Sequence, residues 1–318
     1  MPAPALRRVD RQNRGIRTFF FRHPSFRFRH TMQALPDTLC YLNGEYTPVS
    51  EAKVSVLDRG FIFGDGIYEV VPVYGRKLFR FNEHMARLAR SLTSLSIDNP
   101  HTAEEWLERC RRLMAQLPEE DQMIYIQVTR GVAVRDHAMT KGIAPTVFMM
   151  VNAMKLPSAE TLKKGVACVT ASDFRWERAD IKSTSLLGNV LARQISVDAG
   201  ATETILTRDG LLTEASSSNV WVVRGGTVFG APKSKHVLEG IRYELIRELC
   251  EEEGIAYDLR PISEAELRGA DELILSSASK EVLPVTQLDG QKVGDGQPGP
   301  VFARLHAAYQ RAKAAQSI

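Results

Sequence analysis

The chain has 318 residues, of which 44% are hydrophobic and 25% are charged, as is typical of a folded globular protein. No run of the sequence approaches the roughly 18 apolar residues that a membrane-spanning helix needs, and we expect a cytoplasmic protein. The cysteines are widely spaced and form no CxxC pair, so we expect buried thiols in a reducing compartment, with no disulfide and no metal site. They are Cys40, Cys110, Cys168 and Cys250.

The formal net charge of +3 is unevenly distributed. Residues 1–31 hold eight arginines and one acid, Asp10, a formal charge of +7, so the remainder of the chain carries −4. Three interpretations of this basic segment compete. It could be a tail for nucleic acid or a membrane surface, an arginine-rich targeting segment, or a disordered extension translated from a start codon upstream of Met32. We favour a disordered extension over residues 1–38.

Beyond this extension, the first half of the chain carries strand and helix signals in turn. Thr102 and Glu105 have the spacing of a capping box, which marks the start of a helix. In chain order we expect a hairpin over Cys40–Val49, a glycine-punctuated bend at Phe61–Gly66, strands over Ile67–Tyr74 and Lys77–Phe81, a helix capped by Asn82, a helix over Thr102–Gln116, and strands over Met123–Thr129 and Thr146–Val151.

The second half carries two hairpin signals in series, with turns at Asp209-Gly210 and Gly225-Gly226. The elements expected here are a strand over Val166–Ala171, a helix over Ser185–Ala199, hairpin strands over Glu203–Leu206 with Leu211–Glu214 and over Val220–Val223 with Thr227–Phe229, a helix over Gly240–Glu252, a strand over Asp271–Ser276 and a helix over Pro300–Ala315. The patterns predict a mixed α+β fold with an N-terminal domain over residues 39–153, a linker over 154–160 and a C-terminal domain over 161–318.

One lysine lies among small polar and apolar residues. Lys182 follows Ile181 and precedes Ser183, between a predicted strand and a predicted helix. A lysine in such surroundings loses hydration, which favours the nucleophilic amine that a Schiff base requires. The signal is weak by itself, because most lysines at the edge of an element are solvated.

A glutamate stands at the end of a predicted hairpin strand. Glu214 precedes three consecutive serines, Ser216, Ser217 and Ser218. A carboxylate in this position can pair with a protonated heterocycle, while hydroxyls and backbone amides can bind anionic groups. A solvated strand end is the alternative interpretation.

Other positions are suited to anionic groups. Gly240-Ile241 opens a predicted helix, whose free N–H groups can bind phosphate, and Arg87 lies on the first predicted helix. Arg135 and His137 lie two residues apart on a charged loop, where an extended backbone would direct both toward one substrate carboxylate. An ordinary helix start, a solvated basic face and a surface loop are the respective alternatives.

Four ordered motifs together resemble the fold-type IV pyridoxal-phosphate enzymes, which include D-amino-acid aminotransferases, branched-chain aminotransferases and aminodeoxychorismate lyases. The motifs are Asp58–Glu69, Asn82–Leu88, Asp180–Ser183 and Thr213–Asn219, and the resemblance spans roughly residues 39–315. It implies a smaller N-terminal α/β domain, a larger C-terminal β-barrel-like domain with helices that binds pyridoxal 5′-phosphate, and a homodimer.

The resemblance also implies a role for individual residues. Lys182 would form the Schiff base and move the proton, Glu214 would pair with the pyridine nitrogen, and Arg87 would bind the phosphate. Tyr68 is expected on the substrate side. The other cofactor contacts that the resemblance implies are Arg175, Ser217, Ser218, Ile241 and Ser279.

Arg135-Asp136-His137 resembles the substrate-carboxylate trap of D-amino-acid aminotransferases, which arrives from the neighbouring subunit. This implies a ping-pong transamination of a D-amino acid such as D-alanine with 2-oxoglutarate, giving the 2-oxo acid and D-glutamate. The chain departs from the family pattern at Pro72, where a lysine is common, at Arg242, which replaces the threonine of Gly-Ile-Thr, and at Ala278, which replaces a further threonine.

Two alternatives stay open. A branched-chain L-amino-acid aminotransferase or an aminodeoxychorismate lyase would use the same fold. A nucleic-acid-binding protein would act through residues 7–29, but the acidic charge of the rest of the chain weighs against it. We therefore expect small amino and oxo acids as partners, with neither a membrane nor a nucleic acid.

Overall fold

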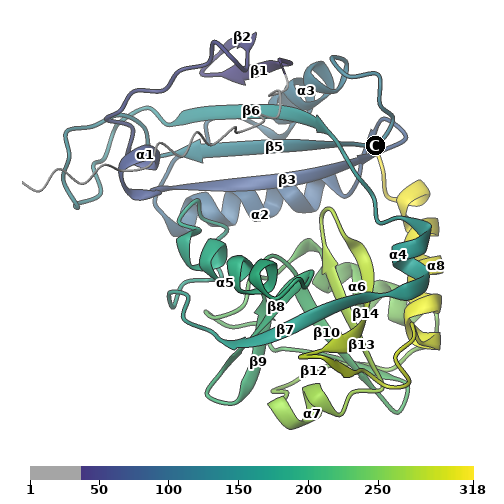
Figure 1. Cartoon of the computed structure of the whole chain (residues 1–318). Coiled ribbons are helices and arrows are strands. Elements are labelled where there is room, and N and C mark those ends of the chain that lie inside the picture. Colours follow the sequence, from purple (N-terminus) through teal and green to yellow (C-terminus); the bar gives the residue numbers. More distant parts are fainter. Residues whose placement is uncertain (1–36) are drawn as a thin grey trace, which may run out of the picture. The chain divides into compact units, whose positions relative to one another are not determined.

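The computed structural model describes residues 37–318 (Figure 1). The interpretations of the arginine-rich segment fall on residues 1–36 and so lie outside the described residues. All four cysteines are buried and free, as the sequence predicts. Within residues 37–318, no helix has both the length and the apolar character needed to cross a membrane.

The first half of the described chain forms an antiparallel six-stranded sheet in the order β2-β1-β6-β5-β3-β4. Two helices, α2 (Phe81–Ser94) and α3 (Ala103–Met114), pack on it around one hydrophobic cluster that includes Leu88, Trp106 and Ile124. The short helix α1 (Arg59–Phe63) precedes β3 (Figure 1). The strands are β1 (Leu39–Leu42), β2 (Glu45–Pro48), β3 (Gly66–Tyr74), β4 (Lys77–Leu78), β5 (Gln122–Thr129) and β6 (Thr146–Ala153).

The second half forms a mixed nine-stranded sheet in the order β12-β11-β10-β13-β14-β7-β8-β9, with β15 beside β14. The strands are β7 (Val166–Ser172), β8 (Glu203–Arg208), β9 (Leu211–Ala215), β10 (Asn219–Arg224), β11 (Thr227–Gly230), β12 (Tyr257–Leu259), β13 (Glu272–Ser277), β14 (Glu281–Leu288) and β15 (Gln291–Lys292). The helices are α4 (Ala159–Lys164), α5 (Leu187–Asp198), α6 (Ile241–Glu252), α7 (Glu264–Arg268) and α8 (Pro300–Ala315).

This larger sheet curls back on itself. β9, at one end of the strand order, contacts β10, which lies near the other end. The curl surrounds a second hydrophobic cluster, to which Ile205, Leu273 and the α7 residue Leu267 belong. The expected mixed fold with a barrel-like C-terminal part is therefore confirmed.

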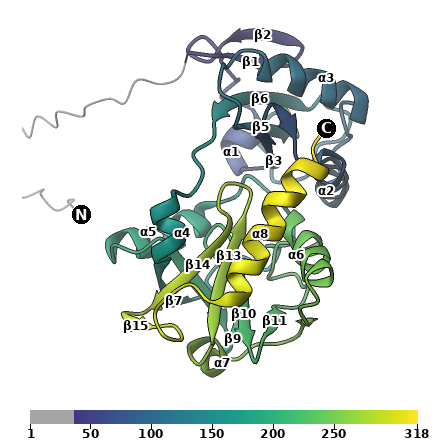
Figure 2. The same cartoon turned by 90° about the vertical axis from the view of Figure 1, so that its right-hand side faces the viewer.

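Helix α8 links the two sheets (Figure 2). The ring of Tyr309 lies 5.7 Å from that of Phe79, and Leu78 and Ile318 exchange backbone hydrogen bonds of 2.9 and 3.0 Å. The C-terminal segment thereby joins the first sheet as a partner of β4. Residues of both predicted domains share this contact. The division into two domains with a linker at 154–160 stays a prediction.

Several element boundaries differ from the predicted ones. The first part of the bend predicted at Phe61–Gly66 belongs to the short helix α1, whose start the Asp58 side chain caps by accepting from the Gly60 amide at 2.8 Å. Gly64, at φ 66°, ends this helix before β3 begins. Asn82 is not a helix cap: Arg80, at φ 52°, turns the chain from β4 directly into α2, which begins at Phe81. The capping box at Thr102 and the bounds of α8 are as predicted.

Candidate active site

A cavity of about 610 Å³ is lined by residues from both sheets. Nine of the eleven predicted site residues contribute to its wall, although they are spread over more than 200 positions of the chain. They are Tyr68, Arg87, Arg175, Lys182, Glu214, Ser217, Ser218, Ile241 and Ser279. Arg135 and His137 do not line the cavity.

Lys182 is held beside β3 by backbone contacts. The Tyr68 amide donates to the Lys182 carbonyl across 3.0 Å, and Ser183 pairs with Ile67 as an isolated β-bridge. The Lys182 Nζ lies 4.0 Å from the centre of the Tyr68 ring. The segment therefore places the lysine amine and the tyrosine side by side on one wall of the cavity.

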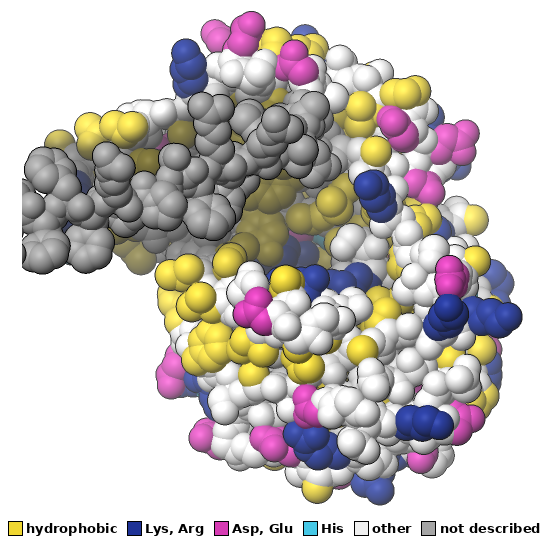
Figure 3. Space-filling view, in the orientation of Figure 1, with side chains coloured by type: hydrophobic (Ala, Val, Ile, Leu, Met, Phe, Trp, Pro, Cys, Tyr) yellow, Lys and Arg dark blue, Asp and Glu magenta, His cyan; other side chains and the backbone are white. Residues whose placement is uncertain are grey.

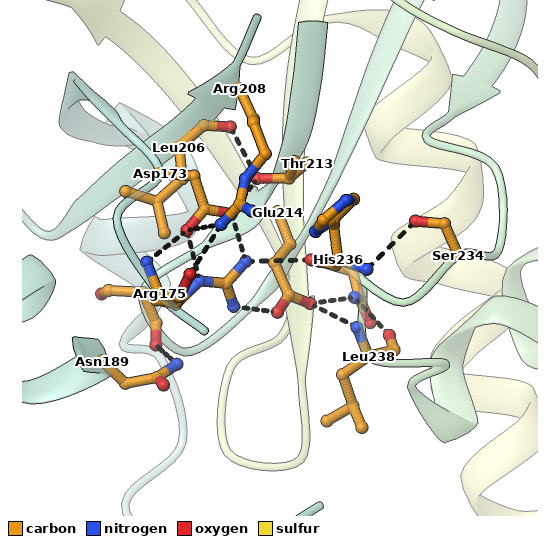
Figure 4. Close-up of polar contacts among 12 residues, drawn as sticks. Asp173, Arg175, Asn189, Leu206, Arg208, Thr213, Glu214, Ser234, His236 and Leu238 are labelled. Atoms are coloured by element: carbon orange, nitrogen blue, oxygen red, sulfur yellow. Dashed lines mark hydrogen bonds and ion pairs between the residues drawn. The ribbon is translucent and has the colours of Figure 1, made fainter. Parts of the chain in front are cut away.

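Glu214, at the end of β9, is a buried carboxylate with three hydrogen-bond donors (Figure 4). Arg175 Nη1 donates to its Oε1, while the Leu238 amide and the Asn219 Nδ2 donate to Oε2 across 3.1 and 3.3 Å. Burial raises the pKa of Glu214 to about 7, against the opposing effect of the Arg175 guanidinium. Near neutral pH this group can therefore hold or release a proton.

Arg175 is itself fixed by a second carboxylate. Its Nε and Nη2 donate to the two oxygens of Asp173 across 2.9 and 2.7 Å, and Arg208 lies 3.6 Å from the same carboxylate (Figure 4). Burial opposes ionisation of Asp173, but the hydrogen bonds from Arg175 hold the pKa of this carboxyl below its usual value. Arg175 thus contacts Glu214 as part of a fixed ion network.

Arg87 lies on α2 and forms a buried ion pair with Glu69 of β3. Its Nε and Nη2 donate to the two Glu69 oxygens across 2.7 and 2.8 Å, and His84 Nδ1 is 2.8 Å from Glu69 Oε2. Burial opposes ionisation of Glu69, but Arg87 outweighs it and holds the pKa of Glu69 below its usual range. Burial lowers the pKa of His84 to about 4, so its ring is neutral at pH 7.

The N-terminus of α6 opens into the same cavity. Gly240 has no side chain to cap the first amides of the helix, and Gly240, Ile241 and Arg242 all line the wall. A Cβ on Gly240 would collide with Asn219 Oδ1, so a larger residue here would force the Asn219 side chain to shift. Uncapped amides near an arginine form an anion-binding site. Arg242, which departs from the family pattern, donates to the Tyr309 hydroxyl across 3.0 Å.

The three serines after Glu214 are bound to another buried glutamate. Ser216, Ser217 and Ser218 all donate to Glu203, the last across 2.9 Å. Lys280 Nζ lies 2.9 Å from both Glu203 Oε1 and the Ser217 hydroxyl. These hydroxyls therefore hold two loops of the cavity wall together, whereas the sequence suggested that they bind an anionic group directly.

Arg135 and His137 lie on the exposed loop between β5 and β6. The Arg135 guanidinium is 5.4 Å from the centre of the Phe63 ring, and the centre of the His137 ring is also 5.4 Å from the centre of the Phe63 ring. The two side chains therefore share one aromatic neighbour and lie outside the cavity.

Sequence reasoning missed the buried acids Glu69 and Glu203 as part of the site. A signal for Glu69 was available, because strand alternation places it on the same face as the fully buried Ile67 and Val71. A carboxylate on a core-facing position needs a buried cation. No comparable signal identifies Lys280, because its contact with Glu203 depends on the loop after β13.

Comparison with known proteins agrees with this geometry. Residues 66–288 match the family model described as amino-transferase class IV, which covers more than half of the chain. The chain belongs to this family. It is a pyridoxal-phosphate-dependent aminotransferase of fold type IV.

Similar curated relatives include the D-alanine aminotransferases of Staphylococcus epidermidis, 39% identical over 88% of this chain and 100% of the relative, and of Bacillus licheniformis, 40% identical over 84% and 94%. Similar solved structures include the branched-chain amino acid aminotransferase of Escherichia coli, with a TM-score of 0.81 and 25% identity over 87% of this chain and 94% of that one. The branched-chain aminotransferase of Thermoproteus uzoniensis with norvaline has a TM-score of 0.78 at 25% identity, over 88% and 95%.

The residues of the cavity fit this cofactor. A carboxylate at Glu214 suits a protonated ring nitrogen, and the lysine amine of Lys182 suits an aldehyde. Arg87 and the uncapped amides at Ile241 suit a phosphate. The N-terminus of α6 is the clearest of these observations, because Gly240 has no side chain that could accept a hydrogen bond from the first amides of the helix.

Proposed function

We propose that this class IV aminotransferase transfers the amino group of a D-amino acid such as D-alanine to 2-oxoglutarate, giving the 2-oxo acid and D-glutamate in a ping-pong cycle. The observation that carries the proposal is the pair Arg135 and His137, two donors for one carboxylate that share the Phe63 ring. The D-alanine aminotransferases at about 40% identity support it. The bound cofactor would carry the amino group and take up the electrons of the substrate Cα–H bond.

Each residue of the wall then has a defined task. With the cofactor bound, Lys182 Nζ would accept the Cα proton of the substrate and later give it back, while Tyr68 packs against the lysine side chain. Glu214 holds the proton of the ring nitrogen, and Arg175 fixes the direction of Glu214. Arg87, Ile241 and Ser279 are the proposed phosphate contacts.

The carboxylate contact would decide stereochemistry. An arginine–carboxylate contact contributes about 1.5–3 kcal/mol, which favours one orientation by about one to two powers of ten. With the carboxylate fixed on one side and Lys182 on one face, only one Cα–H bond can point at the amine. Arg135 and His137 therefore select the D enantiomer in this proposal.

We propose that the trap is supplied by a second copy of the chain. Helix α5 exposes apolar side chains at helical spacing, with Leu187 71% and Val190 60% exposed, followed by Leu191 and Ile195. Figure 3 shows hydrophobic side chains gathered over this part of the surface. Exposed apolar stripes of this kind mark protein interfaces, and an interface between two identical chains is most often twofold symmetric.

The D and L half-reactions test the substrate assignment. We expect D-alanine, without an acceptor, to change the visible absorbance of the bound cofactor, and L-alanine to leave it unchanged. Lys182→Ala should abolish both the absorbance band and turnover. Turnover of the L enantiomer alone would refute the proposal.

Mixing a lysine variant with a variant of the proposed trap tests the shared site. If Arg135 acts on the partner's cavity, hybrids of Lys182→Ala and Arg135→Met subunits contain one intact site. Random reassociation should then restore about a quarter of the wild-type activity at low substrate concentration. If the two residues serve the same subunit, mixing restores nothing.

A branched-chain L-amino-acid aminotransferase is the second candidate. It is favoured by the fold match to the branched-chain enzymes and by Pro72, which stands where D-specific relatives often carry lysine. Turnover of L-leucine above that of D-alanine would select it. Release of pyruvate from aminodeoxychorismate without an added oxo acid would select the lyase instead.

A further inference from the structure

The segment Asp58–Gly66 is built against the loop that carries Arg135 and His137, although no residue of this segment lines the cavity. The Arg59 Nη1 donates to the Asp136 carbonyl across 2.5 Å. The Arg59 amide donates to the Gly131 carbonyl across 2.9 Å, and Asp58 pairs with Val132 as an isolated β-bridge. The loop is therefore bound at its beginning and at the residue between the two trap side chains.

Arg59 is held rigidly enough to fix that loop. It is only 3% exposed, and its Nε donates to Asp65 Oδ2 across 2.7 Å. Arg130 binds the same carboxylate through Nε and Nη2 across 2.8 and 3.1 Å. Arg130 also donates to the carbonyls of Leu95 and Ser96, which follow α2. Two arginines on one carboxylate leave the Arg59 guanidinium a single orientation.

Helix α1 is also bonded to the segment that follows Lys182. The hydroxyls of Thr184 and Ser185 donate to the Gly64 carbonyl across 2.9 and 3.0 Å. A Cβ on Gly64 would lie 2.7 Å from the Ser185 hydroxyl oxygen, so the two backbones meet closely at this point. Helix α1, which binds the loop, is therefore itself fixed to the segment after Lys182.

Phe63, the last residue of α1, contacts both trap side chains. Its ring centre lies 4.8 Å from the Arg59 guanidinium carbon and 5.4 Å from that of Arg135. The His137 ring is 5.4 Å away at an interplanar angle of 44°. One half-buried ring thus contacts two arginines and a histidine, on whose positions the carboxylate contact depends.

The contact of Phe63 with Arg135 and His137 matters because both side chains are exposed. Arg135 and His137 are both exposed, and a free arginine side chain loses rotamer entropy when a ligand orders it. A neighbouring ring that limits these rotamers beforehand reduces the cost at binding. The carbonyl contact at Asp136 limits the backbone between them in the same way.

We propose that Arg59 and Phe63 are positioning residues for the substrate carboxylate: Arg59 fixes the backbone of the loop at Asp136, and Phe63 fixes the side chains of Arg135 and His137. This inference rests on the proposed function, in which those two side chains bind the carboxylate. It assigns a task to the segment Asp58–Gly66, which contributes no residue to the cavity.

Steady-state kinetics of the holoenzyme with D-alanine and 2-oxoglutarate test the inference, together with inhibition by propionate, a carboxylate without an amino group. Phe63→Leu keeps the apolar bulk but removes the ring face. We expect the KM for D-alanine and the inhibition constant of propionate to rise about three- to tenfold, with kcat within about twofold. Phe63→Tyr keeps the ring and should restore both constants.

A matched control exists in the second sheet. Phe229 is half-buried and has the Arg260 guanidinium 4.2 Å from its ring centre, and neither residue lines the cavity. Phe229→Leu removes the same kind of contact, so it measures the effect of such a change on stability alone. We expect unchanged KM and inhibition constants for this variant.

Arg59→Lys provides a second variant that retains the charge. Lysine cannot reach both Asp65 and the Asp136 carbonyl as the planar guanidinium does, so the same two constants should rise with little change in kcat. The double variant Phe63→Leu/Arg135→Met should bind propionate less weakly than the product of the two single effects predicts, because both changes act on the Arg135 contact.

The outcomes distinguish a failure of the positioning role from a failure of the proposed carboxylate trap. If Arg135→Met raises both constants while Phe63→Leu and Arg59→Lys leave them unchanged, the positioning role is wrong and the proposed carboxylate trap stands. If kcat falls in the Phe63 variant with both constants unchanged, the ring serves stability only and the inference is again refuted. If Arg135→Met itself changes neither constant, the proposed trap fails and the positioning role fails with it.

Discussion

Replacing Glu214 by glutamine should change the pH dependence of stability in a defined direction. Burial raises the pKa of this carboxyl from its ordinary 4.5 to about 7, so between these values the folded chain retains a proton that the unfolded chain has lost. Stability contributed by such a group is full below pH 4.5 and is lost as the pH rises toward 7 and above. A shift of this size corresponds to about 3 kcal/mol at pH 8.

Glutamine has the shape of the carboxyl group but cannot ionise, so Glu214→Gln avoids this loss. We expect the free energy of unfolding of the cofactor-free variant, relative to wild type, to increase by about 3 kcal/mol between pH 4.5 and pH 8. Urea unfolding at both pH values measures the difference. The holoenzyme should nevertheless lose about ten- to a hundredfold in kcat, because a neutral amide cannot keep the ring nitrogen protonated.

Glu266 supplies a control of opposite sign. It is the capping-box residue of α7, and hydrogen bonds from Arg260 and Ser263 lower its pKa to about 2. Glu266→Gln should therefore lose stability relative to wild type as the pH rises from about 2 to 4.5, and the difference should stay constant above pH 4.5. A relative stability of Glu214→Gln that is constant with pH, or that falls as the pH rises, would refute the reasoning about the buried carboxyl.

Three further substitutions follow from the same contacts. Arg87→Met leaves Glu69 buried without its ion-pair partner and should lower the free energy of unfolding by about 3–5 kcal/mol at pH 7, less at pH 4, as chemical denaturation can measure. Gly240→Ala places a Cβ against Asn219 Oδ1 and should weaken cofactor binding by about 1–3 kcal/mol, measured by titrating the cofactor-free protein with pyridoxal phosphate. Arg175→Met should raise the pKa of Glu214 further, so kcat should fall at pH 7 and recover as the pH rises, and a flat pH–rate profile would contradict this.

Local patterns in the sequence predicted most of the elements, and the resemblance to a known family predicted the candidate site residues. The capping box at Thr102, the Asp209-Gly210 turn and the proline that starts α8 are local features, which act within a few residues of the chain. Nine of the eleven predicted site residues line one cavity, and six of these belong to the four motifs whose order indicates the family.

Other features depended on contacts between distant segments, which no local pattern records. Arg80 precedes the first residue of α2, and its guanidinium binds Glu248 of α6 and Gln316 near the C-terminus. The predicted cap at Asn82 was therefore wrong. The serine hydroxyls serve Glu203 because β8 places that carboxylate beneath them.

The sequence by itself thus determined the family and the fold class, and it predicted the lysine–glutamate pair of the candidate site. Only the tertiary structure decided how each charge is balanced: Glu69 with Arg87, Asp173 with Arg175, and Asp65 with Arg59 and Arg130. The physical reason is that a buried charge is stable only beside a partner of opposite charge. Which partner lies within hydrogen-bonding distance is decided by how the two sheets and their loops pack.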